Sequence, residues 1–571
     1  MKRVLCLVFL LFLPLCGIFA VTAQEVIPLG SAVYTDMDNL YLVLGIGTPS
    51  DARPWTKGET RAILSVVEGK NLNGVAKKVY DTLASTLAEE LRWTFPDGFS
   101  AGVNLDLWGE LYTHTNTDVS QGFTSHEDWN YGFVQRKPLE RLRLDMAVSD
   151  FFYTYCDLQY GYGIALYYDE LKTLSESGHS QVGSLTTESG LVIVDGDSVL
   201  SQYTNAFSTN FITKSRDFDF QWPKRAIISV GGDRWNVTVG RDKLSWGNSH
   251  IGNFIYDNHV DFQEFARFSV FSEYFKYEAV NLFLDTSYSS ENFFRMMMSH
   301  RLEFKPFHAF TLAVSENVMY KDDVLDLRFL NPAFIYHNLN EREKFNAIAH
   351  LEASYTMAPG LNLYGQFSLD QAVAPNEDDD ESTAWGALLG IEYARVLKEG
   401  IYATAFEGAM TLPCLYRRDG IDFLMGRRYA GLDGVENSHW YTQKFDYIGF
   451  PYGGDALVFK WDNSYRIPSY GAVGLTFTAL WHGNMDMYTN VSIDSSYANY
   501  GSTMFIGDTI ATTVTTTING EYELKGFGAR VSAKVYTQLD WIVRSTYTKA
   551  SKTYSDFTQD LQCSFGVGLS L

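Results

Sequence analysis

Two different spacings of apolar residues divide the chain near residue 97. In the first part, Val75, Val79, Leu83, Leu87 and Leu91 recur every four residues, which predicts an amphipathic helix. A second helix is predicted to begin at Thr56-Lys57-Gly58-Glu59, where Thr56 can cap the backbone and Glu59 can reach back as in a capping box. Its apolar positions are Ile63, Leu64, Val66 and Val67. Asp36 to Leu44 is predicted to be a third helical segment that ends around Gly45 and Gly47.

After the predicted turn Pro96-Asp97-Gly98, the spacing changes from helical to alternating. Apolar residues now occupy every second position in three clear segments, with polar residues or Trp between most of them: Val103, Leu105, Leu107 and Leu111; Leu142, Leu144, Met146 and Val148; Val531, Ala533, Val535, Leu539 and Trp541. A strand with one apolar and one polar face suits either a soluble sandwich or the lipid-facing wall of a barrel.

Two features of the strand region favour the barrel. The chain ends on a segment with Leu561, Cys563, Phe565, Val567, Leu569 and Leu571 on one face, which resembles the C-terminal β-signal of outer-membrane barrels. Tyrosines also gather near predicted strand ends, as interfacial aromatic girdles require: Tyr153, Tyr155, Tyr160, Tyr162, Tyr167 and Tyr168. The alternative for these tyrosines is ordinary β-propensity.

The N-terminus predicts export. Lys2 and Arg3 precede an apolar run from Val4 to Ala20, and small residues lead to a predicted signal-peptide cleavage after Ala23. The alternative is a lipoprotein signal with Cys16 as the acylated residue. Loss of Lys2 and Arg3 would take the formal net charge from -23 to -25, so nucleic acid is not an expected partner. The remaining cysteines, Cys156, Cys414 and Cys563, form no disulfide framework.

The expected fold is an all-β transmembrane barrel of about 16 to 18 antiparallel strands with a small N-terminal α-helical domain. The predicted division is a signal peptide over residues 1–23, a helical periplasmic domain over 24–96 and the barrel over 97–571. Three stretches are predicted to be loops: Thr173 to Gly190, Asn376 to Ser382 and Asp433 to Ser438.

Three segments, in order, resemble Wzi-type capsule assembly proteins. The first is Val26 to Gly30 with Tyr34 to Leu44, Arg53-Pro54-Trp55-Thr56 and Glu59; the second is Val239 to Gly247; the third is Phe329-Leu330-Asn331-Pro332 with Asn338, Asn346, Tyr364-Gly365-Gln366 and Asp370-Gln371. This resemblance implies an outer-membrane lectin barrel of about 18 strands with a helical periplasmic part, which holds exported polysaccharide at the cell surface.

Candidate ligand-binding residues come from these segments and from two arginine pairs. Arg241, Asp242, Lys243 and Trp246 would place an aromatic ring beside hydrogen-bonding groups, as sugar sites do, and a tight turn with a girdle Trp is the alternative. Asn331 and Asp370 belong to the third segment. The pairs Arg417–Arg418 and Arg427–Arg428 flank predicted turn glycines and could bind an anionic glycan, or else lipid phosphates or a pore wall.

Catalysis is not expected. Asp195-Gly196-Asp197-Ser198 is similar to one esterase nucleophile block, but the sequence has no Asp-x-x-His to complete it, and it has no Gly-x-Ser-x-Gly or His-Glu-x-x-His. No metal or cofactor is expected. The predicted partners are surface polysaccharide, outer-membrane lipid and the barrel assembly machinery. The alternatives are a porin or substrate-selective channel, and a secreted β-rich adhesin.

Overall fold

The computed structural model describes most of the chain after the predicted signal peptide. The described residues are 22–70, 72–88, 92–96, 98–123, 129–132, 135–160, 193–194, 197–198, 207–211, 223–285, 293–324, 328, 331, 344–371, 383–418, 421–432, 439–487, 503–524 and 531–571. The predicted signal up to Val21, the three predicted loops, and Tyr162, Tyr167 and Tyr168 lie outside them.

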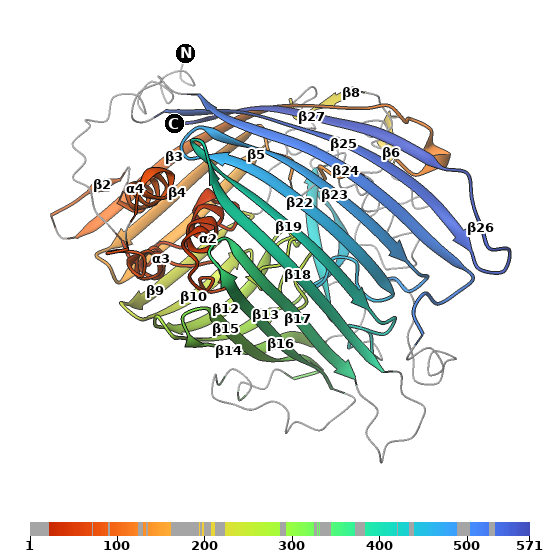
Figure 1. The fold of residues 1–571 in the computed structure, drawn as a ribbon, viewed down its shortest axis with the longest axis horizontal. Coiled ribbons are helices and arrows are strands. Elements are labelled where there is room, and N and C mark those ends of the chain that lie inside the picture. The colour runs from red at the N-terminus through yellow and green to blue at the C-terminus, as the bar shows by residue number, and fades with distance from the viewer. Residues whose placement is uncertain are drawn as a thin grey trace.

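Within these residues, eighteen antiparallel strands close into one barrel, as the sequence predicted (Figure 1). Neighbouring strands in the chain are neighbours in the wall, and β27 closes the ring by pairing with both β25 and β3. The strands are β3 (Phe99–His114), β4 (Glu140–Val148), β5 (Phe152–Tyr160), β9 (Ala226–Gly232), β10 (Trp235–Asp242), β12 (Gln263–Phe271), β13 (Phe275–Phe283), β14 (Phe294–Phe307), β15 (Phe310–Asp322), β16 (Phe345–Ala358), β17 (Leu361–Gln371), β18 (Ala384–Leu397), β19 (Gly400–Thr411), β22 (Ala456–Ile467), β23 (Gly471–His482), β24 (Thr509–Leu524), β25 (Ser532–Thr548) and β27 (Thr558–Ser570).

Short strands and one 3₁₀ turn complete the described elements. They are β1 (Ala52–Arg53), β2 (Trp93–Thr94), η1 (Val119–Gln121), β6 (Ile193–Val194), β7 (Asp197–Ser198), β8 (Phe207–Thr209), β11 (Ser245–Trp246), β20 (Leu424–Leu432), β21 (His439–Tyr447) and β26 (Thr553–Tyr554). β2 already pairs with β3, so strand structure begins at Trp93, slightly before the predicted boundary.

The wall has inverted polarity compared with a soluble sheet. On β27, Leu561, Phe565 and Val567 are exposed on the outside, while Asp560 and Gln562 are buried on the inside. On β10, Val239 faces out and Thr238 faces in. An apolar outer band and a polar interior are what a lipid-embedded barrel requires.

Two of the tyrosines predicted to form an aromatic girdle face inward instead. Tyr153 and Tyr155 are buried, and Tyr155 lies under the guanidinium of Arg225, 4.7 Å from the ring centroid. Exposed aromatic rings near the wall's edges come from other positions, including Phe307 and Trp541. A tyrosine hydroxyl tolerates the polar lumen, so an alternating pattern with tyrosine does not say which face is outside.

Three helices form the N-terminal unit, which lies at one end of the barrel beside the C-terminus (Figure 1). They are α2 (Ala32–Leu44), α3 (Lys57–Ser65) and α4 (Gly74–Ala88). Gly45 ends α2 in the left-handed conformation, and the Thr56 side chain caps α3 by accepting from the Glu59 amide at 3.1 Å. The Glu59 carboxylate does not reach back as predicted, because it pairs with Lys276 of the wall at 2.6 Å. Among the described residues, no helix is both long and apolar enough to cross a membrane.

The N-terminal unit packs around an apolar core that extends onto Ala394 and Ile401 of the wall, and ion pairs such as Glu59–Lys276 add polar contacts with the barrel. Val75, Val79, Leu83 and Leu87 pack in that core, as their spacing predicted. Short connections such as Pro359–Gly360 lie between strands at the end where the unit sits, and outer-membrane barrels carry their short turns on the periplasmic side. We therefore assign this end to the periplasm.

Candidate functional site

Three chain segments fold into the lumen and fill its middle. They are residues 46–56 of the N-terminal unit, the connection 243–262 between β10 and β12 (the first lumen loop), and the described residues 412–418, 421–426 and 445–455 of the connection between β19 and β22 (the second lumen loop). Ala52, Trp246, Phe254, Tyr416 and Phe450 join inward-facing wall residues in one buried apolar cluster. The lumen is therefore packed with side chains over this described region.

The first lumen loop is bound to the N-terminal unit by a two-stranded sheet. β1 and β11 pair antiparallel, with Ala52 opposite Trp246 and Arg53 opposite Ser245. The Gly247 amide then donates to the Asp51 carbonyl at 3.1 Å. Gly247 has a φ of 110°, and a Cβ there would meet side chains of Asn253 and Gln366 at 2.3 Å. The glycine of the Trp-Gly segment is thus required by close approach and by backbone conformation.

Trp246 is an interior residue, which corrects its predicted role as a sugar platform. Its side chain has no exposed surface, its Nε1 donates to Glu278 at 2.8 Å, and its ring meets Tyr256 edge-on at 4.7 Å. A ring with both faces covered cannot stack on a sugar. Its function in this structure is to hold the first lumen loop against the wall.

Arg241, Asp242 and Lys243 also have protein partners. The Nε of Arg241 donates to Glu264 at 3.0 Å, and its guanidinium covers the Phe262 ring at 4.2 Å. Asp242 accepts from Arg225 at 2.8 Å, and Lys243 donates to the Asn258 carbonyl at 3.0 Å. These three predicted site residues fix the start of the first lumen loop.

The third segment of the resemblance contacts both lumen loops inside the barrel. Gln366 donates to the Asn253 side chain at 2.7 Å and accepts from the Phe254 amide at 3.2 Å. Tyr364 donates to Glu407 at 2.5 Å. Asp370 accepts from the Tyr416 amide at 2.7 Å and so anchors the second lumen loop. Asn331 is exposed, and its sequence neighbours lie outside the described residues.

Of the predicted arginine patch, Arg417 is not part of an open cationic surface. Arg417 is buried, pairs with Asp422 at 3.2 Å and donates to the Asp486 carbonyl. The Arg418 amide donates to the same Asp422 carboxylate at 2.7 Å. Arg427 and Arg428 lie within β20, which corrects their predicted place beside turns. The carboxylate of Asp422 already neutralises the charge of Arg417, so Arg417 stabilises the second lumen loop.

Glu407 is the residue that sequence reasoning missed most clearly. This buried carboxylate accepts from the amides of His250 and Ile251 at 2.8 and 2.7 Å, from the Ser249 hydroxyl at 3.1 Å and from Tyr364. It therefore binds one turn of the first lumen loop to β19. The only sequence signal was a charged residue at an inward-facing position of a strand.

A polar cavity of about 330 Å³ lies between the first lumen loop, α2 and the inner faces of β18, β19 and β22. Its lining includes hydroxyl, amide and carboxylate groups, contributed by Thr35, Asp38, Asn39, Asp51, Asn248, Ser249, His250, Asn258, Glu392, Thr404, Asp462 and Ser464 among others. The Nδ2 of Asn248 is buried and, among the described residues, has no hydrogen-bond partner. An unsatisfied buried donor on a cavity wall is a position for a ligand or a water molecule.

Charge in this lumenal cavity is predominantly negative. Arg53 binds Asp38 through two contacts of 2.7 and 2.8 Å, and His250 pairs with Asp462 at 2.9 Å. Burial opposes the charge on His250, but the hydrogen bond that His250 donates to Asp462 and the nearby carboxylates raise its pKa to about 9. Burial raises the pKa of Asp51 well above its usual range. The cavity thus offers acceptors for hydroxyl groups, with two cations held in fixed places.

The fold and its filled lumen define an outer-membrane β-barrel. No protein-family model matches this chain, and no curated protein sequence matches it. Among solved structures, the chain is similar to Wzi, an outer membrane protein involved in Group 1 capsule assembly in Escherichia coli and described as a carbohydrate binding beta-barrel. That similarity has a TM-score of 0.54 at 10% identity, and it covers 95% of this chain and 99% of the Wzi chain.

Two further solved structures are less similar to this chain. OmpT of Vibrio cholerae matches with a TM-score of 0.34 at 8% identity, over 84% of this chain and 99% of that chain. OprD of Pseudomonas aeruginosa matches with a TM-score of 0.34 at 8% identity, over 82% of this chain and 95% of that chain. The resemblance to Wzi-type proteins is therefore confirmed as a likeness of fold, and the barrel supports an outer-membrane location.

Proposed function

We propose that this protein binds exported surface polysaccharide at the outer membrane and holds it there without chemical change. The likeness of fold to a carbohydrate-binding barrel supports this proposal. The observation that carries it is the packed lumen. A barrel whose lumen is occupied by two loops and part of the N-terminal unit is suited to binding a ligand rather than to free diffusion of solutes through it.

The lumenal cavity is the proposed place for a sugar residue. Sugars present many hydroxyl groups, and sites that read them combine convergent polar side chains with a shaped cavity. The free donor of Asn248, the amides of Asn39 and Asn258 and the carboxylate of Asp38 supply such groups. Burial of an unpaired polar donor costs free energy, and a ligand hydroxyl would remove that cost.

The test compares glycan binding with ion conduction. The purified barrel is presented with a panel of capsular and exopolysaccharides and is separately inserted into planar bilayers. We expect binding to at least one polysaccharide, weakened about ten-fold by Asn248→Leu, with no steady conductance; Asn73→Leu on the outside of the N-terminal unit is the matched control. Steady open-channel conductance without glycan binding would contradict the proposal and favour a porin.

A further inference from the structure

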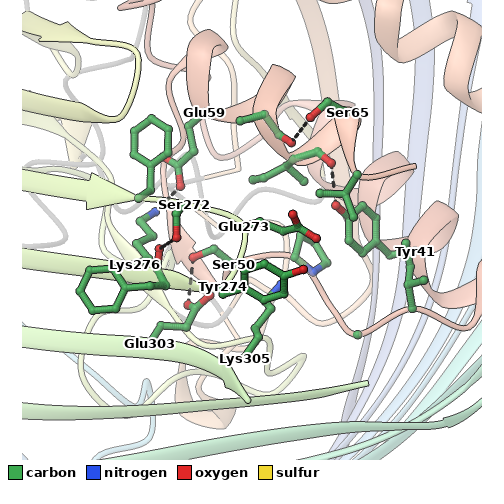
Figure 2. Close-up of a pocket in the computed structure, with 18 of the residues that line it drawn as sticks. Tyr41, Ser50, Glu59, Ser65, Ser272, Glu273, Tyr274, Lys276, Glu303 and Lys305 are labelled. Atoms are coloured by element: carbon green, nitrogen blue, oxygen red, sulfur yellow. Dashed lines mark hydrogen bonds and ion pairs between the residues drawn. The ribbon is translucent and has the colours of Figure 1, made fainter. Parts of the chain in front are cut away.

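A second cavity, of about 220 Å³, lies at the periplasmic mouth between the N-terminal unit and the barrel rim (Figure 2). Tyr41 and Glu59 line it from the N-terminal unit, and Tyr274, Glu303 and Lys305 line it from the barrel. It is separate from the lumenal cavity, since the two share no lining residue. Neither the resemblance nor the proposed glycan site involves it.

The charged groups of this cavity do not cancel. Its acids are Glu59, Glu273 and Glu303, and its cations are Lys70, Arg234, Lys276 and Lys305. Two of the acids have ion-pair partners: Glu59 pairs with Lys276 at 2.6 Å and Glu303 pairs with Arg301 at 2.6 Å, and each of these cations also contacts a second carboxylate, Glu278 at 3.2 Å and Glu352 at 2.7 Å.

Among the described residues, three cations that line the cavity, Lys70, Arg234 and Lys305, have no ion-pair partner, and neither does the lining carboxylate of Glu273. Lys70 and Arg234 are exposed, and among the described residues no acid lies within ion-pair distance of either. Lys305 donates to the Thr48 carbonyl at 2.5 Å. An ammonium group has three N–H donors, so two remain for a ligand. A local cationic cluster can attract an anion at contact even on an acidic protein, because repulsion from distant charges is screened beyond ~8 Å.

The cavity opens at the level of the membrane interface. Tyr274, just before β13, and Phe275, its first residue, are exposed beside the cavity, and Phe307 at the end of β14 is 54% exposed. Exposed aromatic rings at the end of a barrel wall mark the headgroup level of the lipid. Phosphate esters are the anions concentrated at that level.

We infer that the periplasmic-mouth cavity binds a phosphate ester, held by Lys70, Arg234 and Lys305 with the Ser272 hydroxyl beside them. Arginine and lysine are the side chains that bind phosphate oxygens, by a fork of donors and by a point charge respectively. The ester belongs either to a phospholipid headgroup of the adjoining leaflet or to a soluble phosphorylated compound, and the chemistry of recognition is the same for both.

The experiment measures lipid retention in nanodiscs and binding of a soluble ester in detergent, both with the full chain. Native mass spectrometry compares retention of phosphatidylglycerol with that of phosphatidylcholine, and calorimetry measures glycerol 1-phosphate. We expect selective retention of the anionic lipid and a loss of about ten-fold or more in the double variant Lys70→Gln/Arg234→Gln. The matched control Lys77→Gln/Lys78→Gln removes the same charge from exposed positions on α4 and should have no effect.

The two arms identify the source of the phosphate. Retention of the lipid without binding of the soluble ester assigns the site to a headgroup, whereas binding of both assigns it to phosphate esters in general. Glu273→Gln removes the opposing carboxylate and should strengthen binding, a change in the direction that a folding defect would not give. The inference is overturned if neither ligand binds, if both double variants lose binding equally, or if Glu273→Gln weakens it.

Discussion

Replacing Glu407 tests whether one buried carboxylate holds the first lumen loop inside the barrel. Glu407 accepts two backbone amides of the loop, those of His250 and Ile251, together with two hydroxyls. Glu407→Ala removes every one of these contacts, leaving the His250 amide without its acceptor and the Ile251 amide with the Ser249 hydroxyl alone, at 3.0 Å. Glu407→Gln keeps one acceptor oxygen but loses the charge and turns an amide group toward loop donors.

The size of the effect follows from the contacts. A buried amide left without an acceptor costs about 1–3 kcal/mol, so Glu407→Ala should lower the free energy of loop opening by about 3 kcal/mol. Each 1.4 kcal/mol corresponds to about a factor of ten in an equilibrium. The amides of His250 and Ile251 should therefore exchange with deuterium roughly 100-fold faster, and Glu407→Gln should give an intermediate increase.

Hydrogen exchange on the detergent-solubilised barrel is the measurement, with peptides covering residues 249–256. Glu264→Gln is the control, because Glu264 is a half-exposed carboxylate that pairs with Arg241 and receives no loop amide. Its effect should stay below about 1 kcal/mol. Unchanged exchange at 250 and 251 in a folded Glu407→Ala barrel would show that apolar packing around Phe254, rather than the carboxylate, retains the loop.

Four further outcomes are expected. Deletion of Glu25 to Phe95 should leave a barrel that still inserts, since the wall closes without it, but heat-modifiable migration should show a lower unfolding temperature because wall charges lose their partners. Leu571→Asp should reduce membrane incorporation, measured in outer-membrane fractions, because the final strand needs its apolar outer face. Arg417→Ala with Arg418→Ala should weaken the binding of anionic and neutral glycans equally, because it destabilises the second lumen loop. Selective loss of binding to the anionic glycan would instead support these arginines as an anion-binding patch. The His250 ion pair should stabilise the first lumen loop fully below about pH 6.5, and this stabilisation should be lost as the pH rises toward about 9. The stabilisation should be at most about 1 kcal/mol, because the ring is one-third exposed. The rates of amide hydrogen exchange in the wild type and in His250→Gln should therefore converge at high pH.

The wall was predictable from sequence because its pattern is local. Alternation at Leu561, Phe565 and Val567 defines two faces, and their exposure on β27 agrees with the lipid side that the pattern suggested. The helices were predictable for the same reason, since spacing in α4 and the cap at Thr56 depend on neighbouring residues. Ser31, which caps α2 and starts it four residues early, gave a signal that was overlooked.

The candidate site was less predictable because it depends on contacts between distant residues. Trp246 meets Ala52, which lies nearly two hundred positions earlier, and Glu407 accepts from amides of a loop that lies 157 and 156 positions earlier. A tryptophan beside charged residues has the same local sequence whether its ring faces a sugar or the interior. In this protein the ring faces the interior because β1 of the N-terminal unit pairs with β11, which contains Trp246.

The inverted polarity of the barrel explains why its contents are held by charged groups. A lipid-embedded wall turns most of its apolar side chains outward, so a segment that enters the lumen meets Lys276, Arg301 and Glu407 as well as the inward-facing apolar residues of the buried cluster. Buried ion pairs add little net stability compared with apolar packing, but removal of one partner is costly. Such contacts therefore fix where the N-terminal unit and the first lumen loop sit more than how tightly they bind. A position set by specific polar contacts can respond to a polar ligand, and the lumenal cavity lies where those contacts meet.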